Sequence, residues 1–216
     1  MMSDAQLHAI TEADHAAITA AIRAAEAKTS GEVFAVVAHR SDDYRFVAGF
    51  FAALWALILG PVFWLAAPLL GVSLSLANLV VGQALAFLTL LALLWTIAPL
   101  RMLFVPRSVA YRRASANAVR QFLAHGVHAT AERSGVLLFL SIDEHYAEVV
   151  ADAGITSKVD QGVWDEMVAS LVEGAKAGDV VAGFTVAIGQ AGAVLARHFP
   201  PRPGEENELD DRLVEL

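Results

Sequence analysis

The sequence predicts a small α/β sandwich with a mixed sheet, interrupted by a two-helix transmembrane hairpin. Of the 216 residues, 56% are hydrophobic, yet all 15 basic and 23 acidic side chains lie outside residues 46–100. On either side of that region, short β-branched and apolar runs bounded by glycine alternate with Ala-rich runs of helical periodicity. The composition therefore divides the chain into a membrane part and a normally charged α/β part.

The charge-free region contains two apolar segments, residues 46–70 and 79–100, of 25 and 22 residues. About 20 apolar residues suffice for a helix to cross a hydrocarbon core of roughly 30 Å. The link between them, GVSLSLAN, is short and uncharged, so we expect two antiparallel membrane helices. The alternative, a buried helical hairpin in a soluble core, is disfavoured by so long a charge-free run in so short a chain.

Arginine predicts the orientation. Arg40 and Arg45 precede the first segment, and five arginines with no acid among them follow the second between residues 101 and 120. Basic residues near membrane helices stay on the cytoplasmic side. We therefore expect a two-pass integral membrane protein, of a bacterial inner membrane, with the soluble domain and both termini in the cytoplasm. The polar start MMSDAQLHAI is unlike a signal peptide.

Before the hairpin, the sequence predicts one helix and one strand. Thr11 and Asp14 have the spacing of a capping box, and Gly31 stands where a C-terminal cap would lie, so we expect a helix over residues 11–30. The run EVFAVVA at residues 32–38 is short, apolar and bounded by turn residues, which is typical of a buried strand.

After the hairpin, the pattern predicts a helix over 108–125, with Ala118, Val119, Phe122 and Leu123 on one side. Two strand-like runs follow, at 136–142 and 146–151, separated by Asp143-Glu144-His145. Helices are expected over 159–177 and 179–198, and the prolines at 200, 201 and 203 end them. We attribute the glycines at 183, 189 and 192 to close helix–sheet packing rather than to a phosphate-binding loop.

These elements predict one domain split by the hairpin, because the two ends of a membrane hairpin lie on the same side of the membrane and close together. Strands 32–38 and 136–142 would then be parallel neighbours, and 146–151 antiparallel to the second. The predicted parts are residues 1–45, the hairpin 46–100, residues 101–199, and an acidic Pro-rich tail 200–216. The tail carries six acids and two arginines, and is either a docking segment or plain disorder.

The later half resembles the TPM-domain family. The residues that carry the resemblance are GVLLFLSIDEHYAEVVADAGI from Gly135 to Ile155, then Lys176-Ala-Gly-Asp179 and Gly183-Phe184. The resemblance implies an αβα sandwich, and some members are reported to bind calcium or to show weak acid phosphatase activity. Better-known members follow a signal peptide and lie outside the cytoplasm, whereas this domain is predicted inside.

Acidic residues follow the two predicted parallel strands, where ligands tend to bind in such sheets. Asp42 and Asp43 follow the first, and Asp143 and Glu144 the second. Their oxygens could hold Ca²⁺ or Mg²⁺, although no cofactor is required by the sequence. Alternatively, these acids are turn residues that pair with Arg40 and Arg45. His125 and His128 are a weaker metal pair, better interpreted as a helix terminus.

The sequence contains no recognisable catalytic motif, and the lack of cysteine excludes disulfides, thiolate zinc sites and cysteine nucleophiles. A metal-dependent phosphatase is therefore a hypothesis by family analogy only. The charge-free helices suit an anchor or assembly surface, so the first hypothesis is a binding module for an unidentified membrane protein. A small transporter or channel subunit is a third hypothesis, and homo-oligomers are compatible with all three. The net charge of −8 argues against nucleic acid.

Overall fold

The computed structural model describes residues 10–202 and 207–216. Its contacts divide the chain into two compact units. We call the residues up to Ser41 and from Tyr111 onward the sandwich unit, and Asp42–Ala110 the hairpin unit. The sandwich unit thus takes its residues from both sides of the hairpin unit, and each unit is described by itself.

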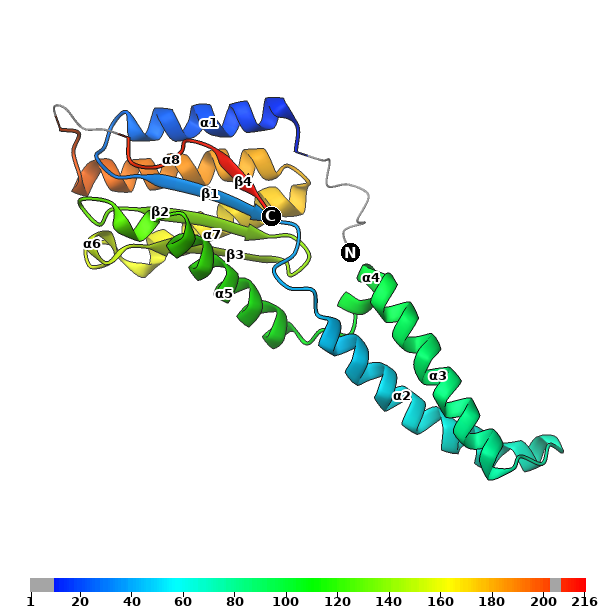
Figure 1. The fold of residues 1–216 in the computed structure, drawn as a ribbon. Coiled ribbons are helices and arrows are strands. Elements are labelled where there is room, and N and C mark those ends of the chain that lie inside the picture. Colours follow the sequence, from blue (N-terminus) through cyan, green and yellow to red (C-terminus); the bar gives the residue numbers. More distant parts are fainter. Residues whose placement is uncertain (1–9, 203–206) are drawn as a thin grey trace. The chain divides into compact units, whose positions relative to one another are not determined.

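The sandwich unit contains a four-stranded mixed sheet in the order β3-β2-β1-β4 (Figure 1). Strands β1 (Val33–Ala38) and β2 (Val136–Ser141) are parallel, with Val33 opposite Val136 and Ala38 opposite Ser141. Strand β3 (Tyr146–Ala151) is antiparallel to β2. The α/β class and these two predicted pairings are confirmed.

The fourth strand, β4 (Leu213–Glu215), was not predicted. It pairs in parallel with β1, and the backbone N–H of Leu216 donates to the carbonyl oxygen of Val37 at 3.0 Å. Disorder is therefore the wrong interpretation of this part of the tail. Only three residues form the strand, too few for a period-two pattern to stand out among the surrounding acids.

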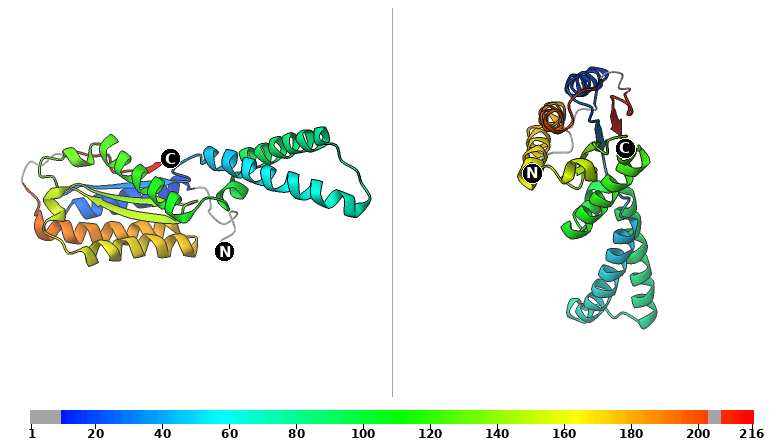
Figure 2. Two further views of the ribbon diagram at one scale, coloured as in Figure 1. Left: turned by 90° about the horizontal axis from the view of Figure 1, so that it is seen from below. Right: turned by 90° about the vertical axis from the view of Figure 1, so that its left-hand side faces the viewer.

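Helices cover both faces of the sheet (Figures 1 and 2). On one face, α1 (Glu12–Glu26), α7 (Gln161–Ala177) and α8 (Val180–His198) enclose the larger core, together with the short α6 (Ala153–Thr156), which was not predicted. On the other face lies α5 (Arg107–Ala124), followed by the 3₁₀ turn η2 (Val127–Ala129). The arrangement is an αβα sandwich.

Helix α1 begins as predicted and ends early. Thr11 and Asp14 form the reciprocal capping box. The helix stops at Glu26 rather than at residue 30, because Thr29 and Ser30 are used elsewhere. The Thr29 hydroxyl and the Ser30 N–H both donate to the carbonyl oxygen of Phe199, at 2.6 and 3.0 Å. These bonds replace the last helical turn.

The side of α5 that packs on the sheet matches the prediction only in part, because Ala118 and Phe122 are buried as predicted and Val119 and Leu123 are not. Ala114, Ala118 and Phe122, spaced four apart, are buried against it. Val119 and Leu123 are 44% and 53% exposed. Each lies one residue after a buried one and therefore about 100° farther round the helix. The sequence pattern is compatible with burial of either pair, so the grouping of Val119 and Leu123 with Ala118 and Phe122 was misleading.

Two of the three glycines of α8, Gly183 and Gly192, pack against helices, so the predicted helix–sheet packing is wrong for them. A Cβ added at Gly174 of α7 would lie 2.5 Å from the Cα of Gly183, and one added at Gly192 would lie 2.6 Å from the Cβ of Ala25 in α1. Gly189 faces open space. Two of the three α8 glycines therefore let helices approach closely.

The hairpin unit consists of α2 (Arg45–Ala66), the 3₁₀ turn η1 (Ala67–Leu70), α3 (Leu76–Thr96) and the short α4 (Ala98–Met102). Helices α2 and α3 lie side by side (Figure 1). A Cβ at Gly60 of α2 would collide with the Gln83 side chain of α3, so the two helices touch closely there.

Among the described residues, three helical segments are long and apolar enough to cross a membrane. They are Arg45–Leu70, Leu76–Thr96 and Val180–His198. The third, which contains α8, differs from the other two because 44% of its apolar window is buried within the protein, against 22% and 6%. Its side chains form much of the sandwich core.

Candidate functional site

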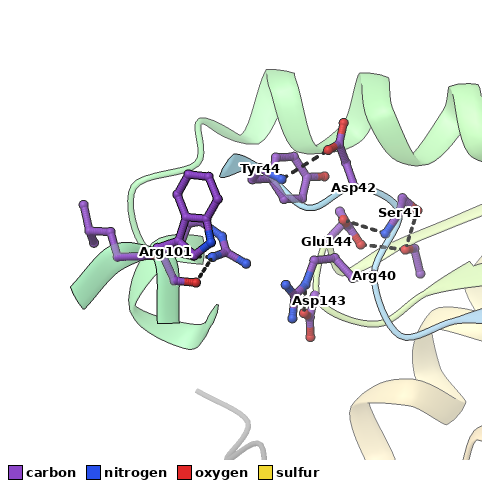
Figure 3. Close-up of polar contacts among 10 residues, drawn as sticks. Arg40, Ser41, Asp42, Tyr44, Arg101, Asp143 and Glu144 are labelled. Atoms are coloured by element: carbon purple, nitrogen blue, oxygen red, sulfur yellow. Dashed lines mark hydrogen bonds and ion pairs between the residues drawn. The ribbon is translucent and has the colours of Figure 1, made fainter. Parts of the chain in front are cut away.

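The best-defined polar cluster of the sandwich unit lies at the carboxyl edge of the sheet, where β1 and β2 end side by side. Their pairing continues past the strands, since the N–H of Asp143 donates to the carbonyl oxygen of His39 at 3.1 Å. The chain then turns at His145, whose φ of 51° is left-handed. This geometry brings Ser41 beside Ser141 and Glu144 (Figure 3).

Glu144 is buried and accepts hydrogen bonds from Ser41 and Ser141. Its Oε1 accepts from the Ser41 N–H at 3.0 Å, and its Oε2 accepts from the Ser141 hydroxyl at 2.6 Å. Because the Ser141 hydroxyl donates to Glu144, the Ser41 hydroxyl must donate to Ser141 across 2.7 Å. Asn117 of α5 donates to Ser41 in turn, at 3.4 Å. A chain of donors therefore ends on the Glu144 carboxylate.

Asp143 has a different partner. It accepts from Arg40 Nε at 2.7 Å, in a pair whose two side chains are each 27% exposed (Figure 3). The predicted alternative, that acids of this edge pair with neighbouring arginines, therefore describes Asp143. Neither Ser41 nor Ser141 was among the predicted site residues. The only feature of the sequence that could have indicated these two residues is a serine near the end of each predicted parallel strand.

The other two predicted ligands belong to the hairpin unit. Asp42 Oδ1 accepts from the Tyr44 N–H at 3.1 Å, and Asp43 pairs with Arg45 at 3.4 Å. Within the described residues no group of three or more His, Asp or Glu side chains is arranged to hold a metal ion. A cation shared by Asp42, Asp43, Asp143 and Glu144 stays a prediction, since these residues are divided between the two units.

The two histidines considered as a metal pair lie beside aromatic rings in tilted arrangements. The ring centroid of His125 lies 4.6 Å from that of Phe34, and His128 lies 6.2 Å from Phe122. Gly126, between them, has a left-handed φ of 71°. This is the helix terminus that the alternative interpretation expected.

A second polar cluster, of carboxylates, lies near the amino end of β1. Burial raises the pKa of Glu26, the last residue of α1, to about 9, and it also raises the pKa of Glu32. Glu26 accepts from the Val33 N–H at 2.9 Å. Although burial alone would raise the pKa of Asp211, hydrogen bonds from Asn207 and Arg23 lower it. The cluster ties the C-terminal segment to α1.

The structure also contains a cavity of about 310 Å³ that sequence reasoning missed. It lies between the first turns of α1 and α8 and the carboxyl ends of β1 and β4. Its lining includes Asp14, His39, Asp179 and Glu215, and apolar side chains such as Ile142. It could not be anticipated without β4, which supplies one wall.

Comparisons with known proteins agree with the fold. The family model described as the TPM domain matches residues 96–194, which confirms the resemblance seen in the sequence. The match does not include α1 and β1, which complete the same sandwich. The NMR structure of the BA42 protein from the psychrophilic bacterium Bizionia argentinensis is similar in fold, with a TM-score of 0.59 and 18% identity over 97% of each chain. Among curated proteins, no match was found.

Proposed function

Because this chain carries a TPM domain over residues 96–194, we propose that it is a two-pass membrane protein that presents this domain at the cytoplasmic face. There the domain acts as a binding module for another membrane protein. Helices α2 and α3 are the two spans, and α8 belongs to the sandwich core.

The distribution of exposed apolar side chains carries the proposal. Of the 28 large hydrophobic side chains that are exposed among the described residues, 23 lie between Phe46 and Leu103. Soluble proteins rarely expose apolar patches larger than a few hundred Å². A hydrocarbon environment removes this cost, because helices satisfy their own backbone polar groups and present only apolar side chains to lipid.

The residues at one end of the hairpin unit fit a membrane–water interface. The Arg45 guanidinium lies over the Trp95 ring, 5.2 Å from its centroid. Arg101 donates to the carbonyl oxygens of Leu94 and Trp95, at 3.0 and 2.9 Å. Tryptophan is enriched at interfaces and arginine on the cytoplasmic side. This pairing supports the orientation expected from the flanking arginines.

The polar cluster supports a structural role over catalysis. Glu144 and Asp143 both accept hydrogen bonds from within the sandwich unit. A carboxylate keeps acceptor positions beyond these bonds, but a general base or cation ligand must also be reached by its substrate or ion, and Glu144 is only 4% exposed. We therefore favour a structural role for this edge and keep the metal-dependent phosphatase as an outcome of the test.

Labelling of single cysteines tests the topology, because the chain has none of its own. Ser73→Cys lies in the exposed link between α2 and α3, and Ala20→Cys lies on the exposed side of α1. In intact cells a membrane-impermeant maleimide should label Ser73→Cys only, and Ala20→Cys should react only after lysis. Reaction of Ser73→Cys from the cytoplasmic side alone would overturn the orientation.

Crosslinking of the detergent-solubilised protein, followed by mass spectrometry, tests the binding role. We expect a reproducible membrane-protein partner that is lost when residues 111–216 are removed. The same preparation should show neither a calcium-dependent rise in melting temperature nor turnover of a generic phosphate ester. Turnover that depends on a divalent cation would favour the phosphatase instead.

A further inference from the structure

Helix α5 has an exposed side opposite the one that packs on the sheet. Ala114, Ala118 and Phe122 face the sheet, so the residues about half a turn away point outward. We call this side the outer face of α5, and it consists of Arg112, Ala116, Val119, Arg120 and Leu123, all of which are exposed.

The outer face is unusually apolar for the surface of this domain. Only five large hydrophobic side chains are exposed among the described residues of the sandwich unit. Two of them, Val119 and Leu123, lie on the outer face of α5, with exposed fractions of 44% and 53%. A third, Tyr111, lies on the sheet side of the helix, with its ring centroid 5.3 Å from that of Tyr146 of β3. An isolated exposed apolar side chain needs no explanation. Two such side chains on the same face of one helix do.

The outer face is also basic, and among the described residues no carboxylate forms an ion pair with its arginines. The sequence of α5, RSVAYRRASANAVRQFLA, contains no acid. Arginines at six positions outside α5 each pair with a carboxylate. Arg112 and Arg120 form no ion pair within residues 10–202 and 207–216. In a chain of net charge −8, two unpaired arginines flanking apolar side chains suit an anionic partner.

The covalent chain limits how far α5 can be from the proposed membrane. Four residues separate the end of α4 at Met102 from the start of α5 at Arg107. Even fully extended, such a link spans no more than about 14–18 Å. If α2 and α3 cross the bilayer, the first turn of α5 is therefore held within reach of its surface.

We propose that the outer face of α5 lies on the cytoplasmic surface of the same membrane, with its arginines on anionic phospholipid headgroups and Val119 and Leu123 at the boundary of the acyl chains. The inference rests on the proposed membrane anchoring. An apolar strip flanked by arginine is the composition of helices that lie in the interface plane. The cytoplasmic leaflet supplies the negative surface that attracts them.

The test uses a spin label at Ala116→Cys, in the middle of the outer face, on the full chain in nanodiscs. Nanodiscs that contain phosphatidylglycerol are compared with nanodiscs of phosphatidylcholine alone. In the anionic lipid we expect the label to become accessible to oxygen and protected from a water-soluble nickel chelate. A label at Ala20→Cys on α1, on the opposite face of the sandwich, should stay in water in both lipids.

Charge variants identify the cause. Arg112→Gln together with Arg120→Gln should return the Ala116 label to its behaviour in neutral lipid, because two basic residues change the ratio of lipid-bound to free helix about 30-fold. Arg197→Gln, at an exposed arginine of α8 without an ion pair within the described residues, should change nothing. High salt should weaken the lipid dependence.

A label at Ala116 that stays in water in both lipids would overturn the inference, and so would protection that is the same with and without the two arginines. Neither result would contradict the proposed membrane anchoring, which is tested separately by the labelling of Ser73→Cys. If Ser73→Cys shows that α2 and α3 do not cross the membrane, both proposals fail together.

Discussion

Leu213 lies directly opposite Ala35 in the parallel pair of β4 and β1. This contact joins the C-terminal segment to the central strand of the sheet. The Leu213 side chain is 3% exposed and belongs to the larger core, with residues of α1, α7 and α8. A segment with the composition of a solvated tail therefore completes the hydrophobic core.

We expect Leu213→Ala to destabilise the sandwich unit by about 2–3 kcal/mol, at the low end for buried leucine because an edge strand can relax into the space. Thermal or urea unfolding of the detergent-solubilised protein measures this change. Leu216→Ala is the control, since that side chain is 45% exposed and should cost less than about 0.5 kcal/mol. Equal effects of the two variants would mean that β4 contributes nothing to the core.

Glu144 and Asp143 should differ in their contributions to stability. Glu144→Ala leaves the Ser41 N–H and the Ser141 hydroxyl without their acceptor, at a cost of about 2–3 kcal/mol. Asp143→Ala breaks a partly exposed ion pair with Arg40, at a cost below about 1 kcal/mol. The same variants test the predicted cation site. A calcium-dependent rise in melting temperature that Glu144→Ala abolishes would make Glu144 a ligand rather than a structural acceptor.

The carboxylate cluster predicts a loss of stability as the pH rises from 4.5 towards about 9. Burial raises the pKa of Glu26 from its ordinary value of 4.5 to about 9 in the folded chain. Folding therefore retains a proton that the unfolded chain releases above pH 4.5, and the stabilisation is lost progressively as the pH rises towards about 9. Glu26→Gln keeps an oxygen for the Val33 N–H and removes the titration, so the melting temperature of this variant should depend less on pH across that window.

Two comparisons complete the pH experiment. Glu173→Gln, at an exposed position of α7, should follow the wild-type pH profile. Asp211 acts in the opposite sense, because its pKa is lowered from 3.8. Its stabilisation is present above that value and is lost as the pH falls below it. A Glu26→Gln profile parallel to that of the wild type between pH 4.5 and about 9 would contradict the assignment.

Local patterns predicted those parts of the fold that depend on neighbouring residues. The capping box of Thr11 and Asp14 marked the start of α1, and the turn Asp143-Glu144-His145 between two apolar runs marked the β2–β3 hairpin. The parallel pairing of β1 with β2 followed from chirality and connectivity. Each signal lies within a few residues of the element that it predicts.

The features that were missed depend on contacts between distant residues. Ser41 and Ser141 meet Glu144 only because Ala38 and Ser141 are in register, and no pattern in either segment contains that register. The side of α5 that packs on the sheet was predicted correctly for Ala118 and Phe122 only, for the same reason. Val119 and Leu123 are as apolar as the residues that are buried, so tertiary packing, rather than periodicity, selected the buried side.

Close packing of α7 against α8 predicts that replacing glycine by alanine has opposite effects on stability at two positions. A Cβ at Gly174 would lie 2.5 Å from the Cα of Gly183 and 2.8 Å from the carbonyl oxygen of Asp179. Both neighbours are backbone atoms and cannot move aside, so Gly174→Ala should destabilise the sandwich unit by about 1–3 kcal/mol. Gly189 of α8 has no neighbour within 4 Å of an added Cβ. There Gly189→Ala should stabilise the protein by about 1 kcal/mol, because alanine favours the helix over glycine. The melting temperatures of the two variants, measured in the same detergent, should therefore move in opposite directions from that of the wild type. A shift of both in the same direction would show that α7 and α8 are not packed as closely as described.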